Sequence, residues 1–238
     1  MFFLKLESNS GDLFFIRYIQ IVDTYKKRLC IMLKFFVDKN TLLQATTLLQ
    51  KPNGVIICPT DTIYGLFCDS RNKDAIERIC EIKQDDRLGK SSDKKFSVIC
   101  SDLEQVKNIA VLSEHDLKIL KDNLPGPFTF VLKSKNINHT EKENINESIG
   151  IRIPDSDIPR QIAKEFDSPL VATSVNISGQ EALKKMDEIK REFSDKVDMI
   201  IDIGNIGVTN KSASTVVSLL NEKPKILREG DGINKLII

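Results

Sequence analysis

Small polar residues gather at three places in the chain, two of them directly after a short apolar segment. Thr60 opens the group at 60–65, Ser174 and Asn176 belong to the group at 173–176, and a third group spans 212–215. Hydroxyl and amide groups can hydrogen-bond phosphate or carboxylate oxygens, and their small size lets a ligand approach the backbone. Any one group is more typical of an ordinary Asx or Ser/Thr turn. Only the three together favour an anion-binding site.

Two arginines lie in predicted strands that are otherwise mostly apolar, where a charged side chain is unusual. Arg152 alternates with Ile151 and Ile153, so its guanidinium needs an anionic partner, either an acidic side chain or the carboxylate of a substrate. Arg228 ends the last predicted strand and is either a ligand clamp or an exposed charge at the end of that strand. The residues alone leave both alternatives open.

Several classes of catalytic site are excluded by what the chain lacks. His115 and His139 are the only two histidines, which leaves almost no material for a histidine metal site or a Ser-His-Asp triad. Residues 89–91 read Gly-Lys-Ser, but the glycine that a P-loop requires earlier is replaced by Gln84. The G-x-G-x-x-G fingerprint of dinucleotide sites is absent. The sequence does not identify any metal ligand.

The composition favours a cytoplasmic protein with a net charge near zero, which leaves room for a local basic groove. Lys and Arg total 35 against 34 Asp and Glu, giving a formal net charge of +1, so no global field requires a nucleic-acid or membrane partner. The five cysteines are odd in number, lie mostly among apolar neighbours, and are expected to be reduced core residues. No segment approaches the ~20 apolar residues of a membrane span, so we expect no membrane contact.

Helical and strand patterns alternate along the chain. Helices are predicted at 38–51, 72–83, 103–110, 114–122, 157–166 and 183–194; strands are predicted at 55–58, 96–100, 128–133, 149–153, 170–173, 199–203, 214–219 and 225–228. This alternation predicts an α/β fold in which ligands bind beyond the carboxyl ends of strands. Residues 84–95 are predicted to be a mobile flap and 134–147 a surface loop. Residues 1–31 have no steady period and are expected to be an N-terminal extension of a single domain at 32–238.

Six segments, in this order, together resemble the YrdC-type family of threonylcarbamoyl-AMP synthases. They are PTDTIYGL at 59–66, PGPFT at 125–129, IRIP at 151–154, TSVNISG at 173–179, STV at 214–216 and ILR at 226–228. The family patterns that they match are PT(D/E)TxYGL, GPxT, (V/I)R(M/I)P, TSANxSG, STV and LRxG. The matching order and spacing hold from about Met32 to the C-terminus, and six ordered matches are much more specific than any one of them.

The resemblance implies an open, twisted, mixed sheet flanked by helices, with a concave, electropositive cavity. It also implies that the threonine amine captures carbon dioxide from bicarbonate and that the carbamate attacks ATP with release of pyrophosphate, with Mg²⁺ carried by the ATP. No covalent protein nucleophile is expected, because the reaction requires positioning and charge stabilisation. By position, Thr60 and Arg152 would bind threonine, Arg152 by a two-pronged bond to its carboxylate. The residues expected to contact ATP are Lys83, Arg87, Ser148, Ser174, Asn176 and Arg228.

The chain departs from the family pattern between 83 and 99. Asp85 stands where the family's K-x-R-P element has arginine, and Arg87 is expected to substitute for it. A family proline is missing before Phe96, and Ile99 stands where many synthases have a histidine near threonine. These departures resemble the YciO-like branch of the family.

Three functions remain open at this stage. The first is the synthase reaction, which supplies N6-threonylcarbamoyladenosine formation in tRNA, with tRNA threonylcarbamoyl-transfer proteins as downstream partners and only weak RNA contact. The second is a YciO-like paralogue with a different nucleotide reaction. The third is a non-catalytic protein that binds double-stranded RNA on its concave face.

Overall fold

A computed structural model of the protein describes residues 19–23, 29–34, 39–85, 96–135, 148–205 and 212–238. Side-chain environments are described from residue 39 onward. Residues 86–95 of the predicted flap, including Arg87, and 136–147 of the predicted surface loop lie outside the described residues.

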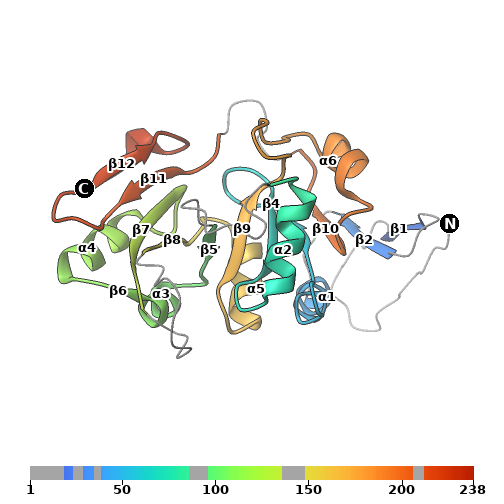
Figure 1. Cartoon of the computed structure of the whole chain (residues 1–238), viewed down its shortest axis with the longest axis horizontal. Helices are drawn as coiled ribbons and strands as arrows, with labels where there is room; N and C mark the ends of the chain where they lie inside the picture. Colours follow the sequence, from blue (N-terminus) through green and yellow to red (C-terminus); the bar gives the residue numbers. More distant parts are fainter. Residues whose placement is uncertain (1–18, 24–28, 35–38, 86–95, 136–147, 206–211) are drawn as a thin grey trace, which may run out of the picture.

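Across the described ranges, the strands form one mixed sheet in the order β1-β2-β10-β3-β4-β9-β5-β8-β7-β11-β12, with β6 paired to β7 (Figure 1). The pairs β2·β10, β10·β3, β5·β8 and β7·β11 are parallel, and the other pairs are antiparallel. The strand bounds are β1 Ile19–Asp23, β2 Leu29–Lys34, β3 Ile56–Cys58, β4 Gly65–Asp69, β5 Ser97–Ile99, β6 Ala110–Val111, β7 Phe128–Ser134, β8 Ser148–Arg152, β9 Leu170–Ser174, β10 Met199–Asp202, β11 Thr215–Ser218 and β12 Lys225–Arg228.

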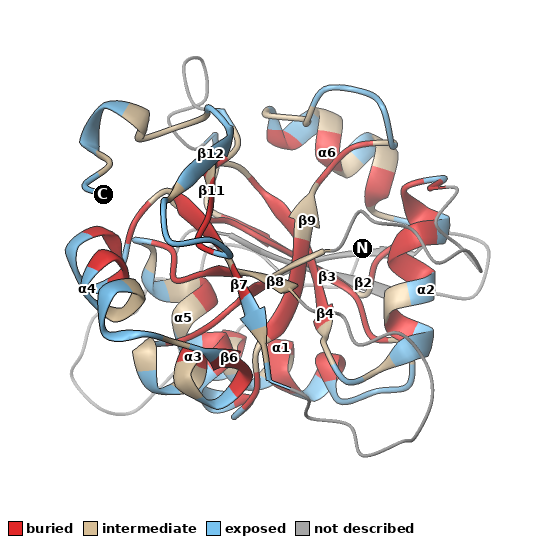
Figure 2. Ribbon diagram, turned by 60° about the vertical axis from the view of Figure 1, so that its left-hand side comes forward, coloured by how far each residue is buried: buried red, intermediate tan, exposed pale blue. Residues whose placement is uncertain are grey.

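Helices cover both faces of this sheet, and two separate cores result. The helices are α1 Lys39–Leu49, α2 Lys73–Ile82, α3 Leu103–Ile109, α4 Glu114–Asn123, α5 Asp157–Glu165 and α6 Met186–Phe193. The smaller core joins Leu49 of α1 and Ile162 of α5 to Phe67 and Ile99 of the sheet. The larger core contains residues of α2, α3, α4 and α6. Figure 2 shows the buried central strands between these layers.

Local sequence explains where several helices begin. The side chain of Asn72 accepts a hydrogen bond from the Ala75 amide before α2, and Asp102 does the same for Gln105 before α3. Ser113 forms a capping box with Asp116 at the start of α4. Each cap satisfies a backbone N–H that has no partner within its own helix.

The predicted fold class is confirmed: the structure is an open, mixed α/β sheet flanked by helices. The predicted helices and strands are present with small shifts at their ends, whereas β1, β2, β4 and β6 were not predicted. β2 runs across residue 31 and pairs with both β1 and β10. The sheet therefore contains segments from both sides of the expected boundary, and the division into an extension and a domain stays a prediction.

No helix in the described ranges is long and apolar enough to cross a membrane.

Candidate active site

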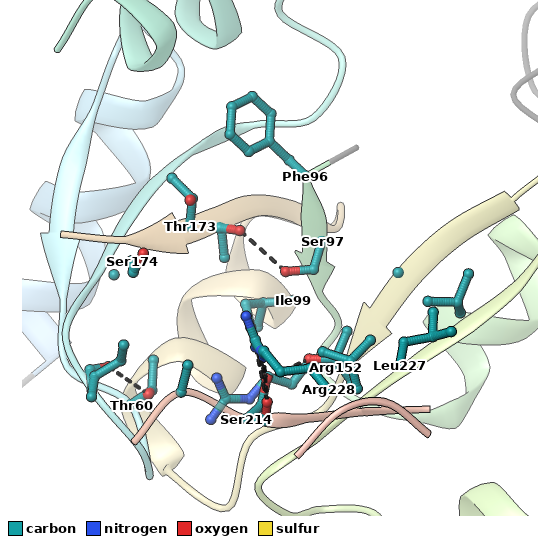
Figure 3. A pocket seen from close by; sticks show the side chains of 18 of the residues that line it. Thr60, Phe96, Ser97, Ile99, Arg152, Thr173, Ser174, Ser214, Leu227 and Arg228 are labelled. Carbon is teal, nitrogen blue, oxygen red and sulfur yellow. Dashed lines mark hydrogen bonds between the residues drawn. The ribbon is translucent and has the colours of Figure 1, made fainter. Parts of the chain in front are cut away.

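A cavity of about 480 Å³ opens on the face of the sheet that carries α1 and α5. The core under these two helices extends as far as Ile99 of β5, and beyond it β8, β7 and β11 present side chains to the cavity. Its lining comprises Thr60, Ile63, Tyr64, Gly65, Phe67, Phe96, Ser97, Ile99, Thr129, Val131, Ser148, Gly150, Arg152, Ala172, Thr173, Ser174, Ala213, Ser214, Val216, Leu220, Leu227 and Arg228. Figure 3 shows many of these side chains pointing into the cavity.

The floor is hollow because three neighbouring strands carry small residues at the same level. Ala172 of β9, Ser97 of β5 and Gly150 of β8 are register partners across the sheet. Larger residues flank this row, since Phe67 pairs with Ala172 and Val131 pairs with Gly150. A Cβ atom on Gly150 would lie 3.4 Å from the Cβ of Ser97, which is ordinary contact. Gly150 therefore keeps the floor of the cavity open, although the backbone conformation does not require glycine at this position.

Arg152 lies at the end of β8, beside its register partner Ile99, and is 8% exposed. Its Nη2 donates to Thr62 Oγ1 at 2.7 Å and forms an ion pair with Asp61. Burial lowers the pKa of Arg152, nearby Asp61 raises it, and the positive charge of Arg228 lowers it further. Arg152 and Arg228 both line this cavity, so an anion bound there lies near two guanidinium groups.

The hydroxyl of Thr60 is already committed within the protein, although Thr60 lines the cavity. Thr60 Oγ1 donates to the carbonyl of Ile63 at 2.6 Å and accepts from the Thr62 amide at 3.1 Å. It also lies 3.1 Å from Thr62 Oγ1. A hydroxyl has one hydrogen to donate and two lone pairs to accept, so this group has no capacity left for a ligand.

Arg228 reaches the cavity from the edge of the sheet because β12 contains an irregularity. Val216 pairs with Arg228 and Val217 pairs with Ile226, so Leu227 is the extra residue. This bulge places consecutive residues, Leu227 and Arg228, in the lining. Nε and Nη2 of Arg228 donate to the carbonyl of Ser214 at 3.2 and 2.8 Å (Figure 3). Partial burial lowers the pKa of Arg228.

Lys83 and Asn176 lie next to the lining residue Ser174, but neither is itself part of the lining. Lys83 Nζ donates to Ser174 O, Asn176 O and Asn176 Oδ1 at 2.8, 3.0 and 2.8 Å. Ser174 Oγ donates to the same Oδ1 at 2.5 Å. Lys83 is 3% exposed and Asn176 is 9% exposed. Lys83 and Asn176 therefore fix the position of Ser174 by hydrogen bonds and do not themselves line the cavity.

Five residues of the predicted site line this one cavity: Thr60, Ser148, Arg152, Ser174 and Arg228. Lys83 and Asn176 contact the lining from outside it, and Arg87 lies outside the described residues. The sequence analysis missed Asp61 and Thr62 as partners of Arg152, although both stand in the motif that begins at Pro59. It also missed Leu227, because a bulge depends on strand pairing and leaves no signal in a single strand.

The described residues contain no group of three or more His, Cys, Asp or Glu side chains that could hold a metal ion.

Comparison with known proteins identifies the family. The Sua5/YciO/YrdC family model, described as "Telomere recombination", matches residues 49–230. The chain therefore belongs to the Sua5/YciO/YrdC family, which confirms the family resemblance seen in the sequence.

Relatives within the family differ in what is known of them. A putative threonylcarbamoyl-AMP synthase of Methanocaldococcus jannaschii is 35% identical over 179 residues, which is 75% of this chain and 81% of that protein. The uncharacterized protein YciO of Escherichia coli K12 is 31% identical over 191 residues, which is 79% of this chain and 88% of that protein.

Solved structures of the family share the fold. The crystal structure of E. coli YciO superposes with a TM-score of 0.76 at 28% identity, covering 88% of this chain and all (100%) of that chain. The structure of P. abyssi Sua5 complexed with L-threonine superposes with a TM-score of 0.73 at 24% identity, covering 87% of this chain and 60% of that one.

Proposed function

We propose that the protein joins ATP, L-threonine and bicarbonate into L-threonylcarbamoyladenylate and releases pyrophosphate. The observation that carries this proposal is the pair Arg152 and Arg228, which share one cavity closely enough for the charge of one to lower the pKa of the other. The volume of the cavity, about 480 Å³, is typical of small-molecule sites. The name of the M. jannaschii relative, a putative threonylcarbamoyl-AMP synthase, supports the same reaction.

The reaction has two bond-forming steps. The threonine amine attacks the carbon of bicarbonate-derived carbon dioxide, which forms an N–C bond and a carbamate and leaves water from the bicarbonate. A carbamate oxygen then attacks the α-phosphorus of ATP, and the bond to the β-phosphate oxygen breaks to release pyrophosphate. Both steps gather negative charge in a small volume, which fixed cations and hydroxyl groups stabilise.

In this proposal the threonine end of the cavity is the one built around Arg152. Arg152 interacts with the carboxylate, Thr60 forms part of the adjacent wall, and Ile99 lies beside Arg152 on the floor. A two-pronged bond to the carboxylate would have to displace Asp61 or Thr62, because both forks of a guanidinium use Nη2 and both hydrogens of that atom are accepted. A single bond from Nη1 requires no such displacement.

The ATP end is formed by Arg228, Ser148 and Ser174, which line the cavity. Lys83 and Asn176 act in this arrangement by holding Ser174. We also propose that Arg87 contacts the triphosphate. Mg²⁺ carried by ATP would neutralise part of the phosphate charge.

The product would pass to the proteins that transfer threonylcarbamoyl to tRNA, where it becomes N6-threonylcarbamoyladenosine. Tight tRNA binding by this protein is not required for that transfer. We place the reaction in the cytoplasm, and the buried Cys58, Cys68 and Cys100, which form no disulfide, are consistent with a reducing compartment.

A YciO-like paralogue with a different nucleotide reaction is the second candidate. Ile99 is 1% exposed and directly beside Arg152, so this part of the floor offers no polar side chain. Asp85 stands where the synthase pattern has arginine, and the E. coli relative is named YciO. These observations favour a changed amino-acid preference more than a changed fold.

Pyrophosphate release from ATP tests the proposal directly. The purified chain is incubated with ATP, Mg²⁺, bicarbonate and labelled L-threonine, and parallel reactions omit threonine or bicarbonate. We expect pyrophosphate and a labelled adenylate only when all substrates are present.

The other outcomes separate the alternatives. ATP consumption without threonine would favour the YciO-like reaction. No ATP consumption, together with strongly salt-dependent binding of duplex RNA, would favour the RNA-binding protein.

A further inference from the structure

The guanidinium of Arg152 is fixed through one of its nitrogens. Nη2 has two hydrogens, and both are accepted: one by Asp61 Oδ1 and the other by Thr62 Oγ1 at 2.7 Å. The carboxylate of Asp61 is itself anchored, because its Oδ2 accepts from the Asp155 amide at 3.0 Å. Arg152 is thereby held from two directions at the end of β8.

The hydroxyl of Thr62 belongs to a directional chain of hydrogen bonds. Thr62 Oγ1 accepts from Arg152, so its own hydrogen is available for Thr60 Oγ1 at 3.1 Å. Thr60 in turn donates to the carbonyl of Ile63 at 2.6 Å. Since the Thr60 hydrogen is already used there, Thr62 is the donor in the contact between the two hydroxyls. The loop at 60–63 is therefore organised around the guanidinium.

The other nitrogens of Arg152 remain available. Nε is buried and has no hydrogen-bond partner among the described residues, and Nη1 donates to none of them. A buried N–H without an acceptor is costly, and Arg78 Nε, away from the cavity, is in the same condition, so Nη1, and not Nε, is the atom that supports a bound ligand. Because Arg152 lines the cavity and Nη1 is not among its buried atoms, Nη1 is a preorganised donor for an anion there.

We propose that Asp61 and Thr62 are positioning residues that hold Arg152 through Nη2, with Nη1 presented to the carboxylate of the amino-acid substrate. Thr60 contributes by accepting the hydrogen bond of Thr62, and its hydroxyl does not contact the substrate. This assignment rests on the function proposed above, because it takes the carboxylate near Arg152 to be that of an amino acid.

Substitutions at Thr62 test the positioning role. Thr62→Val removes both hydrogen bonds at nearly constant volume, whereas Thr62→Ser retains the hydroxyl. We expect Thr62→Val to raise the KM and Kd for L-threonine about tenfold and to leave the Kd for ATP within about twofold of wild type. Thr62→Ser should restore threonine binding. Asp61→Asn should weaken threonine binding in the same selective way.

Two matched controls separate positioning from general destabilisation. Thr47→Val removes a threonine hydroxyl that donates to the Leu43 carbonyl at 2.7 Å on the exposed side of α1. Asp157→Asn weakens an exposed ion pair with Arg160. Neither residue lines the cavity, so both variants should bind threonine as the wild type does. Equal losses of threonine and ATP affinity in Thr62→Val, or failure of Thr62→Ser to recover, would overturn the positioning role.

A spectroscopic measurement tests the positioning role independently of threonine binding. If the wild type binds no threonine, that result refutes only the proposed function. In ¹⁵N–¹H spectra of the arginine side chains, Arg152 should show separate Nη signals in the wild type, because Nη2 is held on both hydrogens. In Thr62→Val these signals should broaden or average, with Arg152→Lys providing the assignment. Averaged signals already present in the wild type would contradict the proposal.

Discussion

At the scale of single residues, Arg152 combines a structural and a functional role. The sequence analysis left open whether its partner was an acid of the protein or a substrate, and the structure shows an ion pair with Asp61 together with donors that remain free. Asp61 and Arg152 are 91 positions apart, so no local pattern could have predicted this pair. The need of Arg152 for an anionic partner, by contrast, was indicated by its place inside an otherwise apolar strand.

Arg152→Ala should affect stability and binding in separable ways. It removes the buried guanidinium that pairs with Asp61, whose side chain is 9% exposed, so we expect the free energy of unfolding to fall by about 3 kcal/mol. Threonine binding should be lost. The double variant Asp61→Ala/Arg152→Ala should recover much of the stability but none of the binding. Urea denaturation and calorimetric titration measure the two quantities, and threonine binding retained in Arg152→Ala would refute the threonine site.

Buried cysteines should be unreactive in the native protein. Burial raises the pKa of Cys58, Cys68 and Cys100, so at pH 8 these thiols stay protonated and the reactive thiolate is scarce. We expect that a thiol reagent such as Ellman's reagent labels none of the three quickly at pH 8. All three should react after denaturation, when their pKa values return to the usual range. Rapid native labelling, located by mass spectrometry at any of these residues, would show that burial is incomplete.

At the scale of elements, apolar runs predicted the central strands because β3 is buried throughout and β5, β8 and β9 are buried along part of their length. β4 was not predicted, because its first residue, Gly65, is also the last residue of the polar group at 60–65, which was interpreted as a loop motif. The cavity floor could not be predicted, because it depends on which strands are neighbours. β5 lies between β9 and β8, although β6 and β7 separate it from them in the sequence.

Gly150→Val should fill the cavity from its floor. A Cβ atom has room at this position and valine is favourable in strands, so the fold should persist while the larger side chain occupies space that the ligand needs. We expect affinity for both substrates to fall about tenfold or more, with a smaller loss in Gly150→Ala. Titration with each substrate and a thermal unfolding curve would measure this, and unchanged affinity in Gly150→Val would place the ligand elsewhere.

At the scale of the whole molecule, Arg78 joins segments that are distant in the sequence. From α2 it donates to the carbonyls of Asn53 and Lys196 at 2.6 and 2.7 Å and forms an ion pair with Asp198. Asp198 also accepts from the Val55 amide at 2.9 Å. This cluster connects α2 to the residues that precede β3 and β10. It lies apart from the lining of the cavity.

Arg78→Met should therefore destabilise the fold without altering ligand contacts. It removes the donor to three acceptors, and we expect a loss of about 3 kcal/mol in the free energy of unfolding. ATP affinity should be unchanged below the unfolding transition. Arg160→Met, which breaks an exposed pair with Asp157, is the matched control and should cost less than about 1 kcal/mol. Equal effects of the two substitutions in urea denaturation would contradict the role assigned to Arg78.

The bulge at Leu227 has a second consequence, for how copies of the molecule meet. β12 is the last strand of the sheet, and all four of its residues are exposed. A long regular edge invites a strand from another molecule to continue the hydrogen-bond ladder, which is a common route to aggregation. The extra residue in β12 interrupts that ladder and twists the strand. The irregularity that brings Arg228 to the cavity thus also discourages edge-to-edge polymerisation.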